Sequence, residues 1–341
     1  MSLSKSSSSA YSKPKPCYSN LPWFIKQRIV DNTDLITRLR LRKVSKECIY
    51  YVERSQFTFE DFSLVVDKKL VTLKIVLSPQ HEITVDYRKA HHYLKSEDSS
   101  YTVGCPDHIK RALKDASILL RSPKITVKML EFAFKPDYQK KSARNKKSQF
   151  LIDWALFHET FQTEFQNLTL NVRDLMLDFL DEDEILGILS HLKSRTLNGI
   201  QFYGPSVDVK FNRLVETDQW KFAERISCPG ITNILKMTHF REGMVNDGSV
   251  TIDEFKQLLQ LFQENPTFSY FFADVRYNYD DFHNYIMQFP QRNPNFDGDR
   301  FIPIPNTDHF MKINLVNRLG ILFVLEKLSK EDLYKDDDEH W

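Results

Sequence analysis

Glycine is unusually scarce in this sequence. It supplies 9 of the 341 residues, whereas an average protein has roughly 7% glycine. Phosphate-binding loops and backbones that closely approach a cofactor depend on glycine, because only glycine adopts positive φ angles without steric cost. The chain also lacks GxSxG, P-loop and GxGxxG motifs. These absences argue against a nucleotide-handling or hydrolytic enzyme, and we expect no catalytic residue and no cofactor.

Cysteine is also scarce, and its four positions lie far apart with no CxxC pair. Disulfide frameworks and cysteine-based zinc sites both need clustered cysteines. We therefore predict reduced thiols and no metal site. Reduced thiols are typical of the cytoplasm and the nucleus, so we expect a cytoplasmic and/or nuclear location. The four residues are Cys17, Cys48, Cys105 and Cys228.

Long hydrophobic runs and an excess of one charge are absent as well. The longest apolar run, Leu319 to Leu325, is much shorter than the roughly 20 residues that span a bilayer. The Ser- and Lys-rich N-terminus has no apolar segment typical of a signal peptide. The 47 basic side chains balance 46 acidic ones, for a net charge of +1, whereas nucleic-acid-binding domains are usually strongly basic. We expect no membrane and no nucleic acid as partner.

The first part of the chain predicts a leader followed by three short helices. Residues 1–19 are rich in Ser, Lys and Pro, a composition typical of disorder. In residues 20–56, Leu21, Ile25 and Ile29 recur at four-residue spacing and so share one helix face. Asn32 to Asp34 offer caps for a second helix, and a third apolar set begins at Val44. Three short helices bury too little surface to be very stable alone, so this unit is expected to need a neighbour or a partner.

Residues 57–122 predict a strand-rich connecting segment that packs on the domain after it. Apolar runs over 57–66, 70–77 and 83–87, separated by polar turns, are typical of strands. A helix is expected over 109–120. Residues 88–104 show no clear period, and we predict a surface loop there.

Residues 123–330 predict a repeat domain in which strands and helices alternate, and residues 331–341 form an acidic tail. Strands expected near 125–129, 168–172, 197–202, 231–237 and 268–275 begin at intervals of roughly 30 to 43 residues, within the range of repeat proteins. Helices lie between them, and Asp181/Glu184 and Thr251/Glu254 match the capping-box pattern. Right-handed crossovers then give a parallel sheet with helices on one side. We favour an irregular leucine-rich-repeat-like arc, with an ordinary layered α/β domain as the alternative.

The segment NLPWFIKQRIVDNTDLITRLRLRKVSKECIYYVER at residues 20–54 resembles an F-box. The similar elements are Leu21-Pro22, Ile25, Ile29, Leu39 and Val44-Ser45-Lys46. The stretch from Arg38 to Val44 is especially similar to the nematode branch of that family. From about Asp218 through Leu328, the chain resembles the FTH domain, formerly a domain of unknown function, that accompanies F-boxes in that branch. The implied fold class is α+β / α/β, with a three-helix F-box followed by the strand–helix arc.

The resemblance implies a non-catalytic role in ubiquitin conjugation. F-box proteins dock on the Skp-type adaptor of SCF-type E3 ubiquitin ligases, and through it on a cullin, while the downstream domain binds a protein substrate. A basic rim on the helical unit would speed docking on an acidic partner, and its residues are Arg38, Arg40, Arg42, Lys43 and Lys46. The residues that the resemblance assigns to adaptor docking are Leu21, Pro22, Ile25, Ile29, Leu39, Val44 and Lys46.

A second hypothesis keeps the F-box fold without the ligase. Thr33 stands where the family usually has Leu, and Leu35 stands where Pro is common. The loss of a Leu anchor at Thr33 favours a protein-interaction scaffold that does not join a ligase.

Overall fold

The computed structural model describes residues 18–89, 94–97, 100–135, 147–178, 181–203, 211–229, 234–248, 250–275, 279–291, 299–317, 321–330 and 332. The chain divides into two compact units, an N-terminal unit, Met1–Phe57, and a sheet unit, Thr58–Trp341. Nearly all of the predicted leader and acidic tail lies outside the described residues. Among the helices in the described ranges, none is long and apolar enough to cross a membrane.

The N-terminal unit contains the three helices predicted from the sequence. They are α1 (Trp23–Asp31), α2 (Leu35–Arg42) and α3 (Lys46–Arg54), preceded by a short 3₁₀ turn, η1 (Tyr18–Asn20). The Asp34 carboxylate accepts a hydrogen bond from the Thr37 backbone N–H, and Ser45 accepts one from that of Cys48. Such side chains satisfy amides that a helix start leaves without partners. The small apolar core consists of Val30, Leu35, Cys48 and Tyr51.

Arg38 lies inside this unit, so its predicted place in an exposed basic rim is wrong. Its side chain donates to the carbonyl oxygens of Asp31 at 2.8 Å, Thr33 at 3.0 Å and Gln56 at 3.2 Å. Its guanidinium also lies over the Phe57 ring, 4.7 Å from the ring centroid. Burial lowers the pKa of Arg38 below its ordinary value. These contacts tie the end of α1 to the segment that follows α3.

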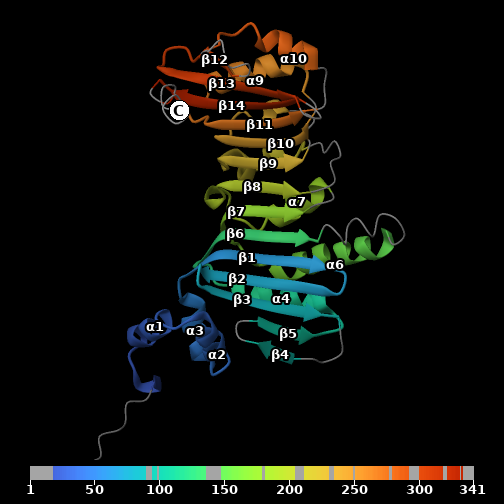
Figure 1. Ribbon diagram of the computed structural model, residues 1–341. Coiled ribbons are helices and arrows are strands. Elements are labelled where there is room, and N and C mark those ends of the chain that lie inside the picture. The colour runs from blue at the N-terminus through green and yellow to red at the C-terminus, as the bar shows by residue number, and fades with distance from the viewer. Residues whose placement is uncertain are drawn as a thin grey trace, which may run out of the picture. The chain divides into compact units, whose positions relative to one another are not determined.

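The described residues of the sheet unit form one 14-stranded sheet, in the order β12-β13-β14-β11-β10-β9-β8-β7-β6-β1-β2-β3-β5-β4 (Figure 1). The strands are β1 (Phe57–Asp67), β2 (Leu70–Ser78), β3 (His81–Arg88), β4 (Leu94–Glu97), β5 (Ser100–Gly104), β6 (Ile125–Phe134), β7 (Asn171–Asp178), β8 (Gly199–Tyr203), β9 (Arg225–Pro229), β10 (Glu242–Gly248), β11 (Tyr270–Val275), β12 (Asp299–Pro303), β13 (His309–Asn317) and β14 (Ile321–Ser329). The helices are α4 (His108–Leu120), α6 (Lys147–Phe165), α7 (Glu182–Leu189), α8 (Asp218–Phe222), α9 (Ile252–Glu264) and α10 (Tyr279–Ile286), with 3₁₀ turns η2 (Ser194–Thr196), η3 (Leu214–Glu216) and η4 (Ile234–Met237).

The middle of the sheet is parallel, as predicted. Every ladder from β6 through β11 runs parallel. Antiparallel ladders join β1 to β2 and β2 to β3, and others join β11, β14, β13 and β12. The predicted strand-rich connecting segment 57–122 supplies strands of this same sheet, with β1 next to β6.

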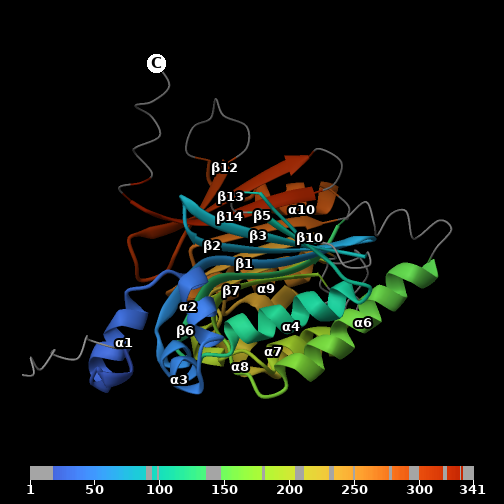
Figure 2. The same cartoon turned by 90° about the horizontal axis from the view of Figure 1, so that it is seen from below.

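Helices α4, α6, α7 and α9 lie on one side of the sheet (Figure 2). The alternation of side chains along each strand sends apolar residues toward them. Phe132 of β6 contacts two aromatic rings of α6, with centroids 5.7 Å from Phe157 and 5.2 Å from Phe161. All three rings are buried. Large aromatic side chains dominate this core, and burying each contributes roughly 2–3 kcal/mol.

Two local predictions are wrong and two helix starts are confirmed. Residues 88–104 contain β4 and β5 instead of only a loop, and 234–237 form a 3₁₀ turn instead of a strand. Short apolar runs do not by themselves distinguish a strand from a helical turn. Both predicted capping boxes are present, Asp181 with Glu184 in α7 and Thr251 with Glu254 in α9.

Candidate protein-docking surfaces

Helix α1 carries two neighbouring stripes with different surroundings. Lys26 and Val30 form the inward stripe, and Val30 is 0% exposed. Ile25 and Ile29, each one residue earlier, form the adjacent stripe; Ile25 is half-buried and Ile29 is 40% exposed. Because a helix turns by about 100° per residue, this second apolar stripe borders the core without entering it. Within the inward stripe, Lys26 forms an ion pair: its ammonium lies 2.6 Å from the Glu47 carboxylate.

The turn between α2 and α3 presents a second apolar position. Val44 is 71% exposed, and Lys46 beside it is also exposed. Leu21 and Leu39 are half-buried, and Pro22 is exposed. Thus none of the residues assigned to adaptor docking by resemblance belongs to the buried core. Their role as adaptor contacts stays a prediction.

The same unit exposes aromatic side chains outside the set of residues predicted for adaptor docking. Trp23 is 70% exposed and Phe24 and Tyr50 are about half exposed. The Trp23 and Phe24 rings pack edge to face with centroids 6.1 Å apart, and the Arg54 guanidinium lies over the Tyr50 ring. Trp23 and Phe24 directly follow Leu21-Pro22. Their position next to this F-box-like motif is the sequence feature that could have identified them as part of the exposed surface.

The basic rim predicted for this unit is smaller than expected. Arg42 pairs with Glu53 at 3.1 Å, and Arg38 is buried. Arg40, Lys43 and Lys46 are exposed and make no ion pair with any described residue. They keep a positive charge beside the exposed apolar side chains.

On the face of the sheet away from the helices, an ion pair crosses a whole strand. Asp174 of β7, Gly199 of β8 and Arg225 of β9 stand in one row of the ladder. The Arg225 guanidinium donates to the Asp174 carboxylate at 2.6 Å. A Cβ at Gly199 would clash with the Asp174 carboxylate, whereas it would lie at an ordinary contact distance, 3.5 Å, from the Arg225 Nε. The glycine therefore makes room for a pair between strands that are not neighbours.

This open face has a shallow hollow of about 380 Å³ beside the ion pair. Met129, Met244 and Tyr270 line it together with Glu242, and Met244 is 39% exposed. Flexible methionine side chains adapt to differently shaped partners, and tyrosine combines an apolar ring with a polar end. The hollow can hold a protein segment that has both apolar and charged side chains.

Carboxyl groups withdrawn from solvent lie on β1, β6 and β7: Asp178 is buried, and Asp61 and Glu131 are half-buried. Burial raises the pKa of Asp178 to about 6, although the Phe134 backbone N–H, which donates to its carboxylate at 2.5 Å, opposes the rise. Burial likewise raises the pKa values of Asp61 and Glu131. Within the described ranges, no group of three or more His, Cys, Asp or Glu side chains is arranged to hold a metal ion.

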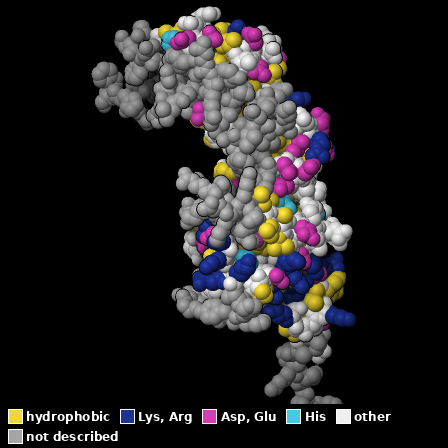
Figure 3. Space-filling model, turned by 90° about the vertical axis from the view of Figure 1, so that its right-hand side faces the viewer, with side chains coloured by type: hydrophobic (Ala, Val, Ile, Leu, Met, Phe, Trp, Pro, Cys, Tyr) yellow, Lys and Arg dark blue, Asp and Glu magenta, His cyan; other side chains and the backbone are white. Residues whose placement is uncertain are grey.

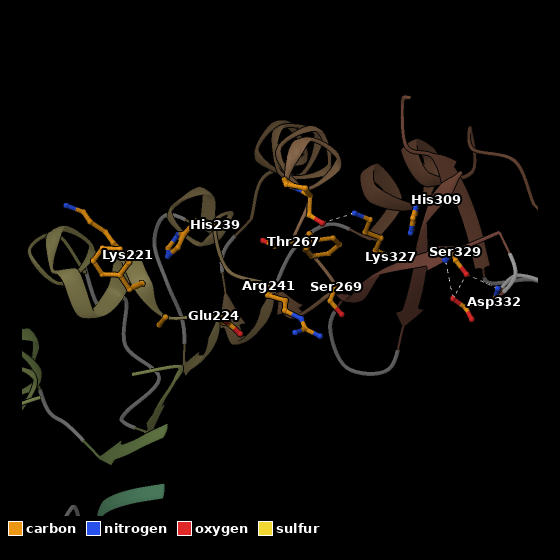
Figure 4. A pocket seen from close by; sticks show the side chains of 14 residues that line it. Lys221, Glu224, His239, Arg241, Thr267, Ser269, His309, Lys327, Ser329 and Asp332 are labelled. Atoms are coloured by element: carbon orange, nitrogen blue, oxygen red, sulfur yellow. Dashed lines mark hydrogen bonds between the residues drawn. The ribbon is translucent and has the colours of Figure 1, made fainter. Parts of the chain in front are cut away.

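A larger groove of about 700 Å³ lies where β9, β10 and β11 begin (Figure 4). Arg241 and Glu224 line it at the starts of β10 and β9. Neighbouring residues already engage two of its cations: Lys221 donates to Glu216, and Lys327 donates to the Pro266 carbonyl. Among the described lining residues, no hydroxyl is hydrogen-bonded to an imidazole, as an activated nucleophile would require.

One known domain family matches the part of the sequence that runs from within α6 to just after α10. Residues 155–289 form an FTH domain. This FTH domain begins earlier than the predicted start near 218 and ends before the predicted 328. It contains β7 to β11, while β6 and β14, the neighbours of its outermost strands, lie outside it. No curated protein matches the chain.

Proposed function

We propose that the chain is a substrate-recognition adaptor of an SCF-type E3 ubiquitin ligase. Residues 20–56 act as an F-box that docks on a Skp-type adaptor and through it on a cullin, and the sheet unit, used as a leucine-rich-repeat-like arc, binds a protein substrate. The FTH domain supports this, since that family is often linked with F-box proteins. In this role the chain has no active site, because other subunits perform the ubiquitin chemistry.

The exposure of Ile29 and Val44 carries the docking half of the proposal. Ile29 lies on α1 and Val44 in the turn between α2 and α3, and both aliphatic side chains are exposed on a unit with a small core. Burying an aliphatic side chain contributes roughly 1.5–3 kcal/mol, so a few such anchors sustain an interface after the cost of association. Arg40, Lys43 and Lys46 add positive charge at its margin, which favours an acidic adaptor surface.

The open face of the sheet is the proposed substrate surface. The Asp174–Arg225 pair fixes two opposite charges next to the hollow lined by Met129, Met244 and Tyr270. The fixed charges orient a bound substrate segment, and the adaptable apolar side chains that line the hollow contribute affinity.

The proposal is tested by co-purification of the full chain with a Skp-type adaptor. We expect Ile29→Asp/Val44→Asp to weaken binding by at least about a hundredfold, because two apolar anchors become charges that would be buried. Ile152→Asp/Leu261→Asp is the matched control, since these aliphatic side chains are also exposed but belong to the sheet unit. We expect the control to bind like the wild type.

The two functional hypotheses differ in one result. If the folded wild type does not bind the adaptor, the ligase role is refuted and the interaction scaffold takes its place. Thr33 favours that alternative. It offers no apolar anchor, and its hydroxyl donates to the Val30 carbonyl at 2.8 Å.

A further inference from the structure

Four segments of the sheet unit meet at the carboxyl ends of β1, β3 and β6. Backbone hydrogen bonds hold them together: Lys89 donates to the Lys69 carbonyl at 3.0 Å, Lys135 to Val66 at 2.9 Å, and Cys105, which leads into α4, to Arg88 at 2.9 Å. We call this surface the basic edge, and it comprises residues 67–69, 86–89, 107–115 and 135. In Figure 3 the right-hand side of the view in Figure 1 faces the viewer, and Lys and Arg side chains, in dark blue, gather on this side of the molecule.

The basic edge carries uncompensated positive charge. Its cations are Lys68, Lys69, Arg88, Lys89, Lys110, Arg111, Lys114 and Lys135, and its acids are Asp67, Asp86, Asp107 and Asp115. Eight cations against four acids leave an excess of four, although the whole chain has a net charge of only +1. The acids are partly used, since Asp67 pairs with Lys135 at 3.5 Å and Asp115 with Arg111 at 3.0 Å.

Five of the lysines are exposed and make no ion pair with any described residue; they are Lys68, Lys69, Lys89, Lys110 and Lys114. Neighbouring like charges repel one another and cost stability. Nothing in the packing of the sheet requires lysine at these positions, because the side chains point into solvent. A charge arrangement that opposes folding is typical of a binding surface.

The start of α4 adds to the positive potential. The Asp107 side chain makes no capping hydrogen bond to the first turn of α4, so that carboxylate does not satisfy the amide groups there. The helix dipole also places partial positive charge at this end. Lys110 and Lys114, one turn apart, are both exposed on the same helix.

We propose that the basic edge binds an acidic segment of a protein substrate. This inference rests on the proposed adaptor role in one respect only: that role is why the bound protein is called a substrate. Nucleic acid is disfavoured because Tyr87, the aromatic residue within these segments, is buried and offers no ring for base stacking. A membrane surface is disfavoured because no exposed large apolar side chain of the described residues falls in these segments.

The test measures the binding of a dye-labelled, glutamate-rich peptide to the full chain by fluorescence anisotropy. In the edge variant, Lys69→Gln/Lys89→Gln/Lys114→Gln, we expect binding about tenfold weaker than in the wild type. Wild-type binding should also weaken steadily as salt is added. The control variant, Lys124→Gln/Lys193→Gln/Lys236→Gln, removes the same charge from exposed lysines outside the basic edge, and its affinity should stay within about twofold of the wild type.

Each other outcome has a defined meaning. Unchanged affinity in the edge variant, or an equal loss in both variants, overturns the proposal. So does tighter, edge-dependent binding of a short single-stranded RNA or of anionic lipid vesicles. The edge variant should still bind the Skp-type adaptor, and Ile29→Asp/Val44→Asp should still bind the peptide. Failure of the adaptor role and failure of the basic edge are therefore distinguishable.

Discussion

Replacement of the buried Arg38 by methionine tests what holds the N-terminal unit together. Methionine matches the aliphatic part of the arginine side chain but carries no charge. It removes every donor that now reaches the carbonyl oxygens of Asp31, Thr33 and Gln56. The hydrogen bonds that join the end of α1 to the segment after α3 are then lost.

The expected loss is large compared with the stability of so small a unit. A hydrogen bond from a charged donor contributes roughly 1.5–3 kcal/mol, but removing a buried cation also recovers part of its desolvation cost. The net effect of losing three bonds is therefore about 2–4 kcal/mol in the free energy of unfolding. A unit with three short helices has a total stability of only a few kcal/mol. We expect Arg38→Met to unfold it locally while the sheet unit stays folded.

Hydrogen exchange of the full chain, read by mass spectrometry, measures this directly. Amides of α1, α2 and α3 should lose most of their protection in Arg38→Met, whereas amides of β6 to β8 serve as an internal reference. Arg40→Met is the control because Arg40 is exposed and unpaired in the described part of the chain. It should change protection by less than about 0.5 kcal/mol. If α1 to α3 in Arg38→Met exchange like the wild type, the carbonyl contacts do not stabilise the unit as argued.

Three further predictions concern the sheet unit and are read from urea denaturation of the full chain. Gly199→Ala should destabilise it by about 1–3 kcal/mol, because the added Cβ displaces the Asp174–Arg225 pair; the double variant with Asp174→Ala should show a smaller penalty for the alanine. Burial raises the pKa of Asp178 from 3.8 to about 6, so ionisation of this carboxyl opposes folding. As the pH rises from about 4 to above 6, the free energy of unfolding of the wild type should fall by up to about 3 kcal/mol relative to that of Asp178→Asn. An unchanged difference between pH 4 and pH 7.5 would contradict that assignment. Thr251→Ala should cost about 1 kcal/mol by removing the α9 cap, and Thr251→Ser should restore most of it.

Local patterns predicted the elements whose signals are local. The alternating apolar residues from Phe57 to Tyr87 correctly predicted three strands, and the spacing of Asp181 with Glu184 correctly predicted the start of α7. A capping box and a strand alternation each lie within a few residues of the chain, so one sequence is enough to find them.

Features that depend on distant residues were not predictable in this way. Arg38 has a charge that favours the surface, and only the arrangement of three carbonyl groups around it explains its burial. The ion pair over Gly199 joins residues 51 positions apart, and it forms only when three strands adopt one particular register. The basic edge likewise combines four separate segments, which sequence spacing does not bring together.

The position of β1 in the sheet has a consequence for the protein while it is being made. Its partner β2 follows immediately, but β6, its neighbour on the other side, begins only at Ile125, after α4. A nascent chain leaving the ribosome therefore exposes the unpaired backbone N–H and C=O groups along one edge of β1 until β6 emerges. Such an edge is a template for wrong pairing with other chains. Molecules whose synthesis stops before residue 134 should aggregate, and this interval is where a chaperone would protect the growing protein.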